Sequence, residues 1–199
     1  MSGLSNKNKL APVPTQGSLL ENQYNGARHN LLLVVGFTVI NLILLLTNSN
    51  TYFLFSAYVP YVFGDLAMYF CGKYPAEYYG GDMANLQFAG NGVFAVLIGL
   101  AVVFIALYLL CWIFSKKQRV GWVIAALVLF CVDTLALFFI GGISADLIMD
   151  YVFHIWVIVS LSRGVFAHYK LKKLPPEEET VSEVEEQEAP AESESFVEN

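Results

Sequence analysis

Two apolar stretches decide the fold of this chain: VGWVIAALVLFCVDTLALFFI at residues 120–140 and LIMDYVFHIWVIVSLSRGVFAH at residues 147–168. An α-helix rises about 1.5 Å per residue, so about twenty apolar residues match a hydrocarbon core of roughly 30 Å. The sequence Gly141-Gly142-Ile143-Ser144 between them is a turn signal. We therefore expect two membrane-spanning helices joined as an antiparallel hairpin.

Three ionisable residues interrupt the apolar character of this hairpin: Asp133, Asp150 and His154. Counted from the turn, Asp133 is about eight residues, or roughly 12 Å, into its helix, and His154 is about nine, or roughly 13 Å. Asp150 precedes His154 by one helical turn, on the same face. If the two helices face each other through these residues, Asp133 lies beside His154 and Asp150 lies nearer the turn.

Two interpretations of these three residues stay open. Acids and histidines inside a membrane often mark an ion or proton path, which makes Asp133, Asp150 and His154 candidates for a proton-responsive site. Alternatively the three groups satisfy one another or a backbone carbonyl, and so fix the pairing of the helices.

The composition places the whole chain among integral membrane proteins. Of its 199 residues 56% are hydrophobic and 14% charged, and the mean hydropathy is +0.55. Ten of the 17 acidic residues are glutamates of segment 175–199, so the formal charge of −6 belongs to that tail. The tail is too polar to bury a core and is predicted to be disordered. Neither part has the basic surface of a nucleic-acid binder.

Two further spans are predicted at residues 31–47 and 89–114, and residues 51–71 form an apolar, aromatic stretch interrupted by Pro60, Gly64 and Asp65. Short loops rich in lysine and arginine stay on the cytoplasmic side of a membrane. The basic groups lie near the amino end, at 116–119 and at 170–173. The three basic groups can all lie on the cytoplasmic side only if segment 51–71 does not cross the membrane. We therefore expect this segment to be an interfacial or re-entrant helix on the outer face.

The predicted fold is therefore all-α, with four spans and both ends cytoplasmic. Residues 1–29 form a cytoplasmic segment, 30–169 the transmembrane domain, and 170–199 a basic stop followed by the acidic tail. Ser18-Leu19-Leu20-Glu21 fits a capping box for a short helix interrupted near Gly26. Gly92 and Gly99, two turns apart, predict a small-residue stripe for close packing of the second span.

Sequence motifs of known chemistry do not occur in the chain. It contains no Walker A, GxGxxG, HExxH or GxSxG pattern, and Cys71, Cys111 and Cys131 do not have metal-site spacing. We therefore predict no catalytic, cofactor-binding or metal-binding residue, and no enzymatic activity.

The stretch from Arg28-His29-Asn30 through Thr51-Tyr52-Phe53-Leu54-Phe55-Ser56-Ala57 resembles uncharacterised small integral membrane proteins of Clostridia-type Gram-positive bacteria. The resemblance covers about a fifth of the chain. It implies a bacterial cytoplasmic membrane and brings no activity, cofactor or binding residues with it.

The leading functional hypothesis is a non-enzymatic scaffold or regulatory subunit of a membrane complex. Its partner would be another membrane protein or a second copy of the chain, reached through the helices, the outer aromatic segment or the acidic tail. The alternative is a proton-coupled transporter or channel subunit that uses Asp133, Asp150 and His154. A third hypothesis is an intramembrane, lipid-active enzyme, which would need a wet cavity containing His154.

Overall fold

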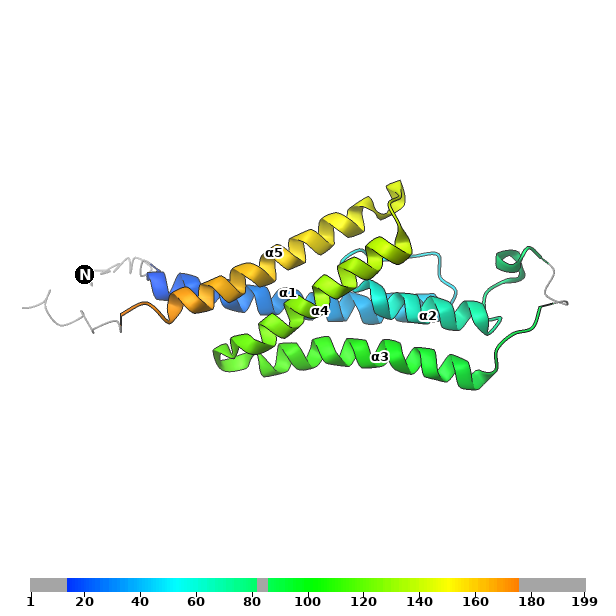
Figure 1. Ribbon diagram of the computed structural model, residues 1–199, viewed down its shortest axis with the longest axis horizontal. Coiled ribbons are helices and arrows are strands. Elements are labelled where there is room, and N and C mark those ends of the chain that lie inside the picture. Colours follow the sequence, from blue (N-terminus) through cyan, green and yellow to red (C-terminus); the bar gives the residue numbers. More distant parts are fainter. Residues whose placement is uncertain (1–13, 82–85, 176–199) are drawn as a thin grey trace, which may run out of the picture.

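The computed structural model describes residues 14–81 and 86–175, and in that part of the chain it consists of helices and connecting segments without a strand. Residues 1–13 of the predicted amino-terminal segment and the acidic tail from residue 176 lie outside the described residues. Five α-helices form the bundle (Figure 1): α1 Gln16–Leu46, α2 Tyr58–Phe70, α3 Asn91–Phe114, α4 Val120–Ala136 and α5 Ile148–Leu171. A π-helical turn, Leu137–Gly141, prolongs α4, and short 3-10 helices lie at Ala76–Tyr79, Lys116–Gln118 and Ala145–Leu147.

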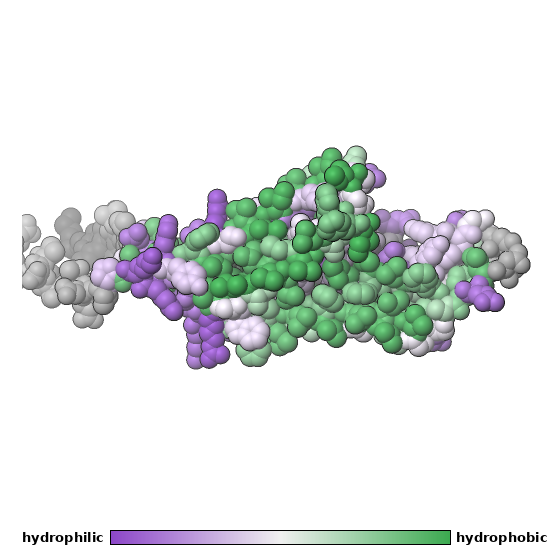
Figure 2. Space-filling view, viewed as in Figure 1, coloured by the Kyte–Doolittle hydropathy of each residue, from purple (hydrophilic) through white to green (hydrophobic). Residues whose placement is uncertain are grey.

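Four of the described helical segments are long and apolar enough to cross a membrane: Gln16–Leu46, Asn91–Phe114, Val120–Gly141 and Ala145–Leu171. On the face seen in Figure 2, apolar residues cover the middle of the molecule, and hydrophilic residues gather towards its two ends. The chain is thus a multi-pass integral membrane protein, and the predicted all-α class with four spans is confirmed.

One end of the bundle carries most of the described basic residues, and we call it the basic end; Lys73 lies at the other end, after α2. The start of α1, the connection from α3 to α4 and the end of α5 meet there (Figure 1). The Tyr24 hydroxyl donates to the carbonyl oxygen of Ser115 at 2.8 Å, and the Arg28 Nε donates to the Ser115 Oγ at 2.8 Å. These bonds tie the amino-terminal half of α1 to the end of α3.

Helix α1 is longer and more continuous than predicted. It begins with Thr15 as N-cap, whose Oγ1 accepts from the Ser18 backbone N–H at 3.3 Å, so the predicted capping box at Ser18 is wrong. Gly26 lies inside the helix instead of interrupting it. A glycine in a helix costs only about 1 kcal/mol relative to alanine, and the packing of the neighbouring Tyr24 and Ala27, both buried, outweighs that cost.

The closest helix contact also differs from the predicted one. A Cβ on Gly92 or Gly99 would meet nothing within 4 Å, so these glycines face away from the bundle and the predicted stripe is wrong. Helix α3 packs through larger residues, among them Ala101, Ile105 and Tyr108. The tight approach is between α1 and α5, where a Cβ on Gly164 would lie 2.5 Å from the Cβ of Ala27.

Candidate functional site

The candidate site is built around a re-entrant segment, residues 51–70. The chain leaves α1 at the end opposite the basic end, turns back along the bundle as extended backbone, and then runs outward again as α2 (Figure 1). The segment was predicted as a helix over 51–71, but the helix begins only at Tyr58. The sequence predicts an interfacial or re-entrant helix that does not cross, and α2, with 13 residues, is not among the described segments long enough to cross a membrane.

Two polar side chains of α1 hold the extended part of the re-entrant segment. The Asn41 Nδ2 donates to the Phe53 carbonyl at 2.6 Å and to the Ser56 Oγ at 2.8 Å, while its Oδ1 accepts from the Phe53 N–H at 2.8 Å. The Thr38 Oγ1 accepts from the Ala57 N–H at 2.8 Å. Thr38 is eight residues before the end of α1, which places this contact roughly 12 Å below it. These bonds stand in for the backbone partners that a helix would have supplied.

Asp133 of α4 caps the start of α2 from a neighbouring helix. Its Oδ2 accepts from the Tyr58 N–H and its Oδ1 from the Val59 N–H, each at 2.8 Å. The first N–H groups of a helix have no partner within it, and a negative charge there is favoured by the helix dipole. Pro60 follows as the third residue of α2 and needs no such partner, because proline has no N–H. The predicted interruption at Pro60 is therefore the first turn of a helix.

His154 of α5 completes this arrangement from the other side of Asp133. Its Nε2 lies 3.0 Å from Asp133 Oδ2, and its Nδ1 lies 2.7 Å from the carbonyl oxygen of Asp150. A carbonyl oxygen can only accept, so Nδ1 carries a hydrogen. One further proton is shared between Nε2 and Oδ2, and the pair is an imidazolium with a carboxylate or a neutral imidazole with an acid.

The Asp133–His154 pair is enclosed by apolar side chains. Asp133 and His154 are each 1% exposed, and the Phe130 ring stacks on the imidazole with a centroid distance of 4.9 Å. On the side towards the basic end, buried residues of three helices fill the interior: Leu31, Val34, Val123, Ala126, Val157 and Leu161. The pair is thus buried in the bundle, with packed hydrocarbon below it.

The third predicted residue, Asp150, has a different place from the other two. Its main-chain carbonyl orients His154, whereas its carboxyl points elsewhere, and Oδ1 is buried without a hydrogen-bond partner among the described residues. The Tyr52 hydroxyl lies beside this carboxyl and is 3.0 Å from the Ser56 Oγ. The structure therefore brings Asp133 and His154 into direct contact, and Asp150 lies between them and the tyrosines described next.

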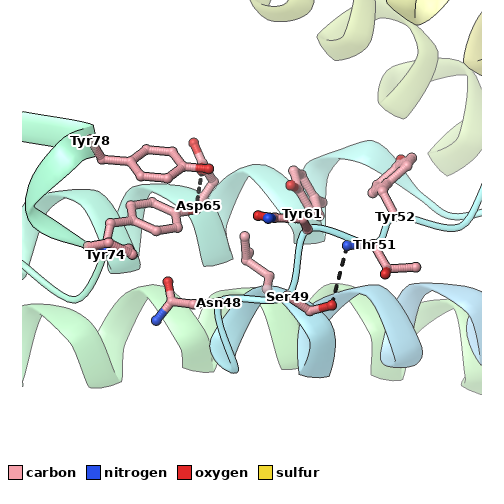
Figure 3. A pocket seen from close by; sticks show the side chains of 11 residues that line it. Asn48, Ser49, Thr51, Tyr52, Tyr61, Asp65, Tyr74 and Tyr78 are labelled. Atoms are coloured by element: carbon pink, nitrogen blue, oxygen red, sulfur yellow. Dashed lines mark hydrogen bonds between the residues drawn. The ribbon is translucent and has the colours of Figure 1, made fainter.

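A cavity of about 400 Å³ opens where the re-entrant segment meets the loop after α2 (Figure 3). We call it the tyrosine cavity; it is lined by Leu45, Asn48, Ser49, Asn50, Thr51, Tyr52, Tyr61, Asp65, Tyr74, Pro75 and Tyr78. The Tyr74 hydroxyl donates to Asp65 Oδ1 at 2.5 Å, and the Tyr74 and Tyr78 rings stack at 4.6 Å. Burial, together with the bond to Asp65, raises the pKa of Tyr74 far above its ordinary value of 10.0, so the phenol keeps its proton.

Sequence reasoning missed the use of Thr38, Asn41 and Asp65. Thr38 and Asn41 are three residues apart and share one helix face, a signal that was compatible with an ordinary interhelical bond. Asp65 is predicted from the sequence only as an interruption of a helix. Within the described residues, no group of three or more histidine, cysteine or acidic side chains is suited to hold a metal ion.

Comparison of the chain with protein-family models, with curated proteins and with solved structures found no match. The resemblance to small membrane proteins of Clostridia-type bacteria therefore stays a prediction. The function is inferred below from the geometry of the chain itself.

Proposed function

We propose that this integral membrane protein is a non-enzymatic subunit that scaffolds or regulates a membrane complex through the face carrying the tyrosine cavity. The observation that supports this best is the use of the polar side chains inside the spans. Thr38, Asn41 and Asp133 all bind backbone groups of residues 53–59, and His154 binds Asp133. Side chains locked by such bonds make a rigid platform, which a recognition surface needs.

The packing below the pair favours this role over conduction. A carrier needs polar or hydrated groups on both sides of its buried charges, because every unpaired polar group in hydrocarbon costs several kcal/mol. Towards the basic end the interior is filled instead by apolar side chains that are 0–1% exposed, such as Val34, Val157 and Leu161. A lipid-active enzyme is not proposed, because His154 does not line the tyrosine cavity.

The orientation follows from the positions of the basic residues. Lys116, Lys117 and Arg119 lie in the α3–α4 connection, at the same end as the last turn of α5 with Lys170. By the preference of such residues for the cytoplasm, the basic end and both termini face the cytoplasm of the cell. The tyrosine cavity then faces outward.

The test is crosslinking in intact membranes from a single cysteine at the cavity rim. Tyr78→Cys, in a chain whose native cysteines are replaced by serine, is expected to crosslink a partner, because Tyr78 is 61% exposed at the rim. Asp146→Cys, exposed at the α4–α5 turn, is the matched control and should not. Adding Asn41→Leu should weaken the Tyr78 product by loosening the platform. Equal products from both positions, unaffected by Asn41→Leu, contradict the proposal.

A second candidate is the proton-coupled carrier or channel subunit. It is favoured by one observation, a row of polar groups that leads from the cavity to the buried pair. Tyr52 lines the cavity and lies beside Asp150. The Asp150 carbonyl binds His154, and His154 binds Asp133. Proton flux into proteoliposomes separates the two candidates. Flux in the parent protein that is lost in Asp133→Asn and in His154→Ala supports the carrier, and absence of flux in the parent removes it.

A further inference from the structure

We propose that the tyrosine cavity binds an organic ammonium group, the charged end of a small amine or quaternary ammonium compound. The proposal names a ligand for the face through which the protein is proposed to act. That this ligand regulates a membrane complex rests on the proposed function. It is argued from the charge, the aromatic walls and the access of the cavity.

The charge of the cavity favours a cation. Among the eleven described residues that line it, Asp65 is the only one with a charged side chain, and none is lysine, arginine or histidine. The carboxylate accepts one hydrogen bond from Tyr74, which leaves most of its lone pairs for a ligand. The nearest lysine along the chain, Lys73, is turned away, with its Nζ 5.0 Å from the ring centroid of Phe94 on α3.

Aromatic rings surround this carboxylate. Figure 3 shows Asp65 between the stacked Tyr74–Tyr78 pair and Tyr61, and Tyr61 makes an edge-to-face contact with Tyr52 at 5.1 Å. The face of an aromatic ring attracts cations, and rings grouped around a site are the usual way to recognise quaternary ammonium. A bare metal ion would gain little from the rings, and a single carboxylate would neutralise only part of its charge.

The cavity is fixed at its base and open at its rim. Tyr74 is 8% exposed and is locked by its bond to Asp65, and Asp65 lies on α2, which Asp133 anchors. Tyr78 at the rim is 61% exposed, so a ligand has access. The volume of about 400 Å³ lies within the range of roughly 300–1,000 Å³ that small-molecule sites occupy.

The same ammonium chemistry has two possible sources: a free organic cation, or the headgroup of a zwitterionic lipid such as phosphatidylcholine. The first measurement is calorimetric titration of the full chain with tetramethylammonium, in nanodiscs of phosphatidylglycerol, which lacks an ammonium group. We expect saturable binding, at least tenfold weaker in Asp65→Asn. Asp146→Asn removes an exposed carboxylate at the α4–α5 turn and should bind as the parent does.

The tyrosine walls are tested by a pair of variants that does not alter the charge. Tyr61→Phe keeps the ring and should bind within about twofold of the parent, whereas Tyr61→Leu removes it and should bind several-fold more weakly. This pair decides the matter if Asp65→Asn fails to fold, as judged by circular dichroism. A parent that does not bind tetramethylammonium, or that binds it equally in Asp65→Asn and Tyr61→Leu, overturns the proposal.

Two sets of phosphatidylglycerol nanodiscs with equal surface charge distinguish the two sources, one diluted with phosphatidylcholine and the other with diacylglycerol, which has no ammonium group. A weaker apparent affinity for tetramethylammonium in the phosphatidylcholine set means that the lipid headgroup competes for the cavity, and equal affinities mean that the natural ligand is a free cation; each result requires the same ammonium site. The crosslinking from Tyr78→Cys is scored separately. If tetramethylammonium does not bind but the Tyr78→Cys crosslink forms, only the ammonium site is overturned. If tetramethylammonium binds but no crosslink forms, only the proposed function is overturned.

Discussion

Replacing Asp133 by asparagine should free the re-entrant segment from the bundle. The carboxylate accepts from the N–H groups of Tyr58 and Val59 and pairs with His154, all in a buried position. An asparagine oxygen can accept one of these donors, but its NH₂ group then faces another donor. Breaking a buried charged pair by removing one partner costs about 3–5 kcal/mol, which is a large share of a total stability of about 5–15 kcal/mol.

The loss should be local, because the hydrogen bonds of the Asp133 carboxylate within residues 14–81 and 86–175 join it to the start of α2 and to His154. Ser56, 1% exposed beside that start, serves as reporter when replaced by cysteine in a chain without native cysteines. A cost of 3–5 kcal/mol raises the population of the opened segment about a hundredfold or more. Asp133→Asn should therefore increase the rate of thiol labelling at Ser56→Cys by about that factor, and Asp146→Asn should leave it unchanged.

Two results would refute this reasoning. Labelling of Ser56→Cys that is as slow in Asp133→Asn as in the parent means that the carboxylate does not hold the segment. The second result concerns His154, the partner of Asp133. The double variant Asp133→Asn/His154→Gln should lose much less free energy of unfolding than the sum of the losses in the two single variants, because both changes remove the same interaction. Full additivity would show that the imidazole and the carboxylate act independently.

Three further predictions concern other parts of the bundle. Asn41→Leu leaves the backbone of Phe53 without two buried partners and should lower the free energy of unfolding by about 1–3 kcal/mol per orphaned group, measured by denaturant titration in micelles. The pKa of Tyr74 is higher in the folded state than its ordinary value of 10.0. The contribution of this phenol to stability is therefore complete below pH 10.0 and is lost as the pH rises further. Tyr74→Phe should remove a late-ionising step from the ultraviolet absorbance titration. Gly164→Val overfills the contact between α1 and α5 and should destabilise by about 1–3 kcal/mol in thermal unfolding, while Gly99→Val, which faces open space, should change little.

The pairing of Asp133 with His154 could be predicted from the sequence because it depends on counting. A short turn at Gly141 fixes two antiparallel helices, and residues at equal distances from it come to the same depth. The spans themselves followed from hydropathy. The start of α2 could not be predicted as well, because Asp133 caps it, and a cap supplied by another helix has no local pattern. The start of α1 was missed for another reason: Thr15 and Ser18 are both suitable N-cap residues, and the structure uses Thr15.

The partners of the buried polar residues could not be predicted for a related reason. Asp133 binds the backbone of residues 75 and 74 positions before it, and backbone N–H groups look alike at every position of a sequence. Phe55 adopts a φ of 76°, a left-handed conformation that non-glycine residues rarely take. Its sequence context of aromatic residues predicts a helix or strand instead.

Three polar side chains inside the spans are explained by the re-entrant segment, because they bind its open backbone groups. Irregular backbone inside a bilayer must find partners within the protein, and backbone groups at Phe53, at Ala57 and at the start of α2 find them in side chains of α1 and α4. Asn41, Thr38 and Asp133 meet these needs in chain order, at Phe53, Ala57 and the start of α2. Asp65, which lies beyond this set in the tyrosine cavity, is not needed to satisfy any described backbone group. Its one hydrogen bond among the described residues comes from Tyr74, so the lone pairs that this bond leaves open face the tyrosine cavity, where a ligand can use them.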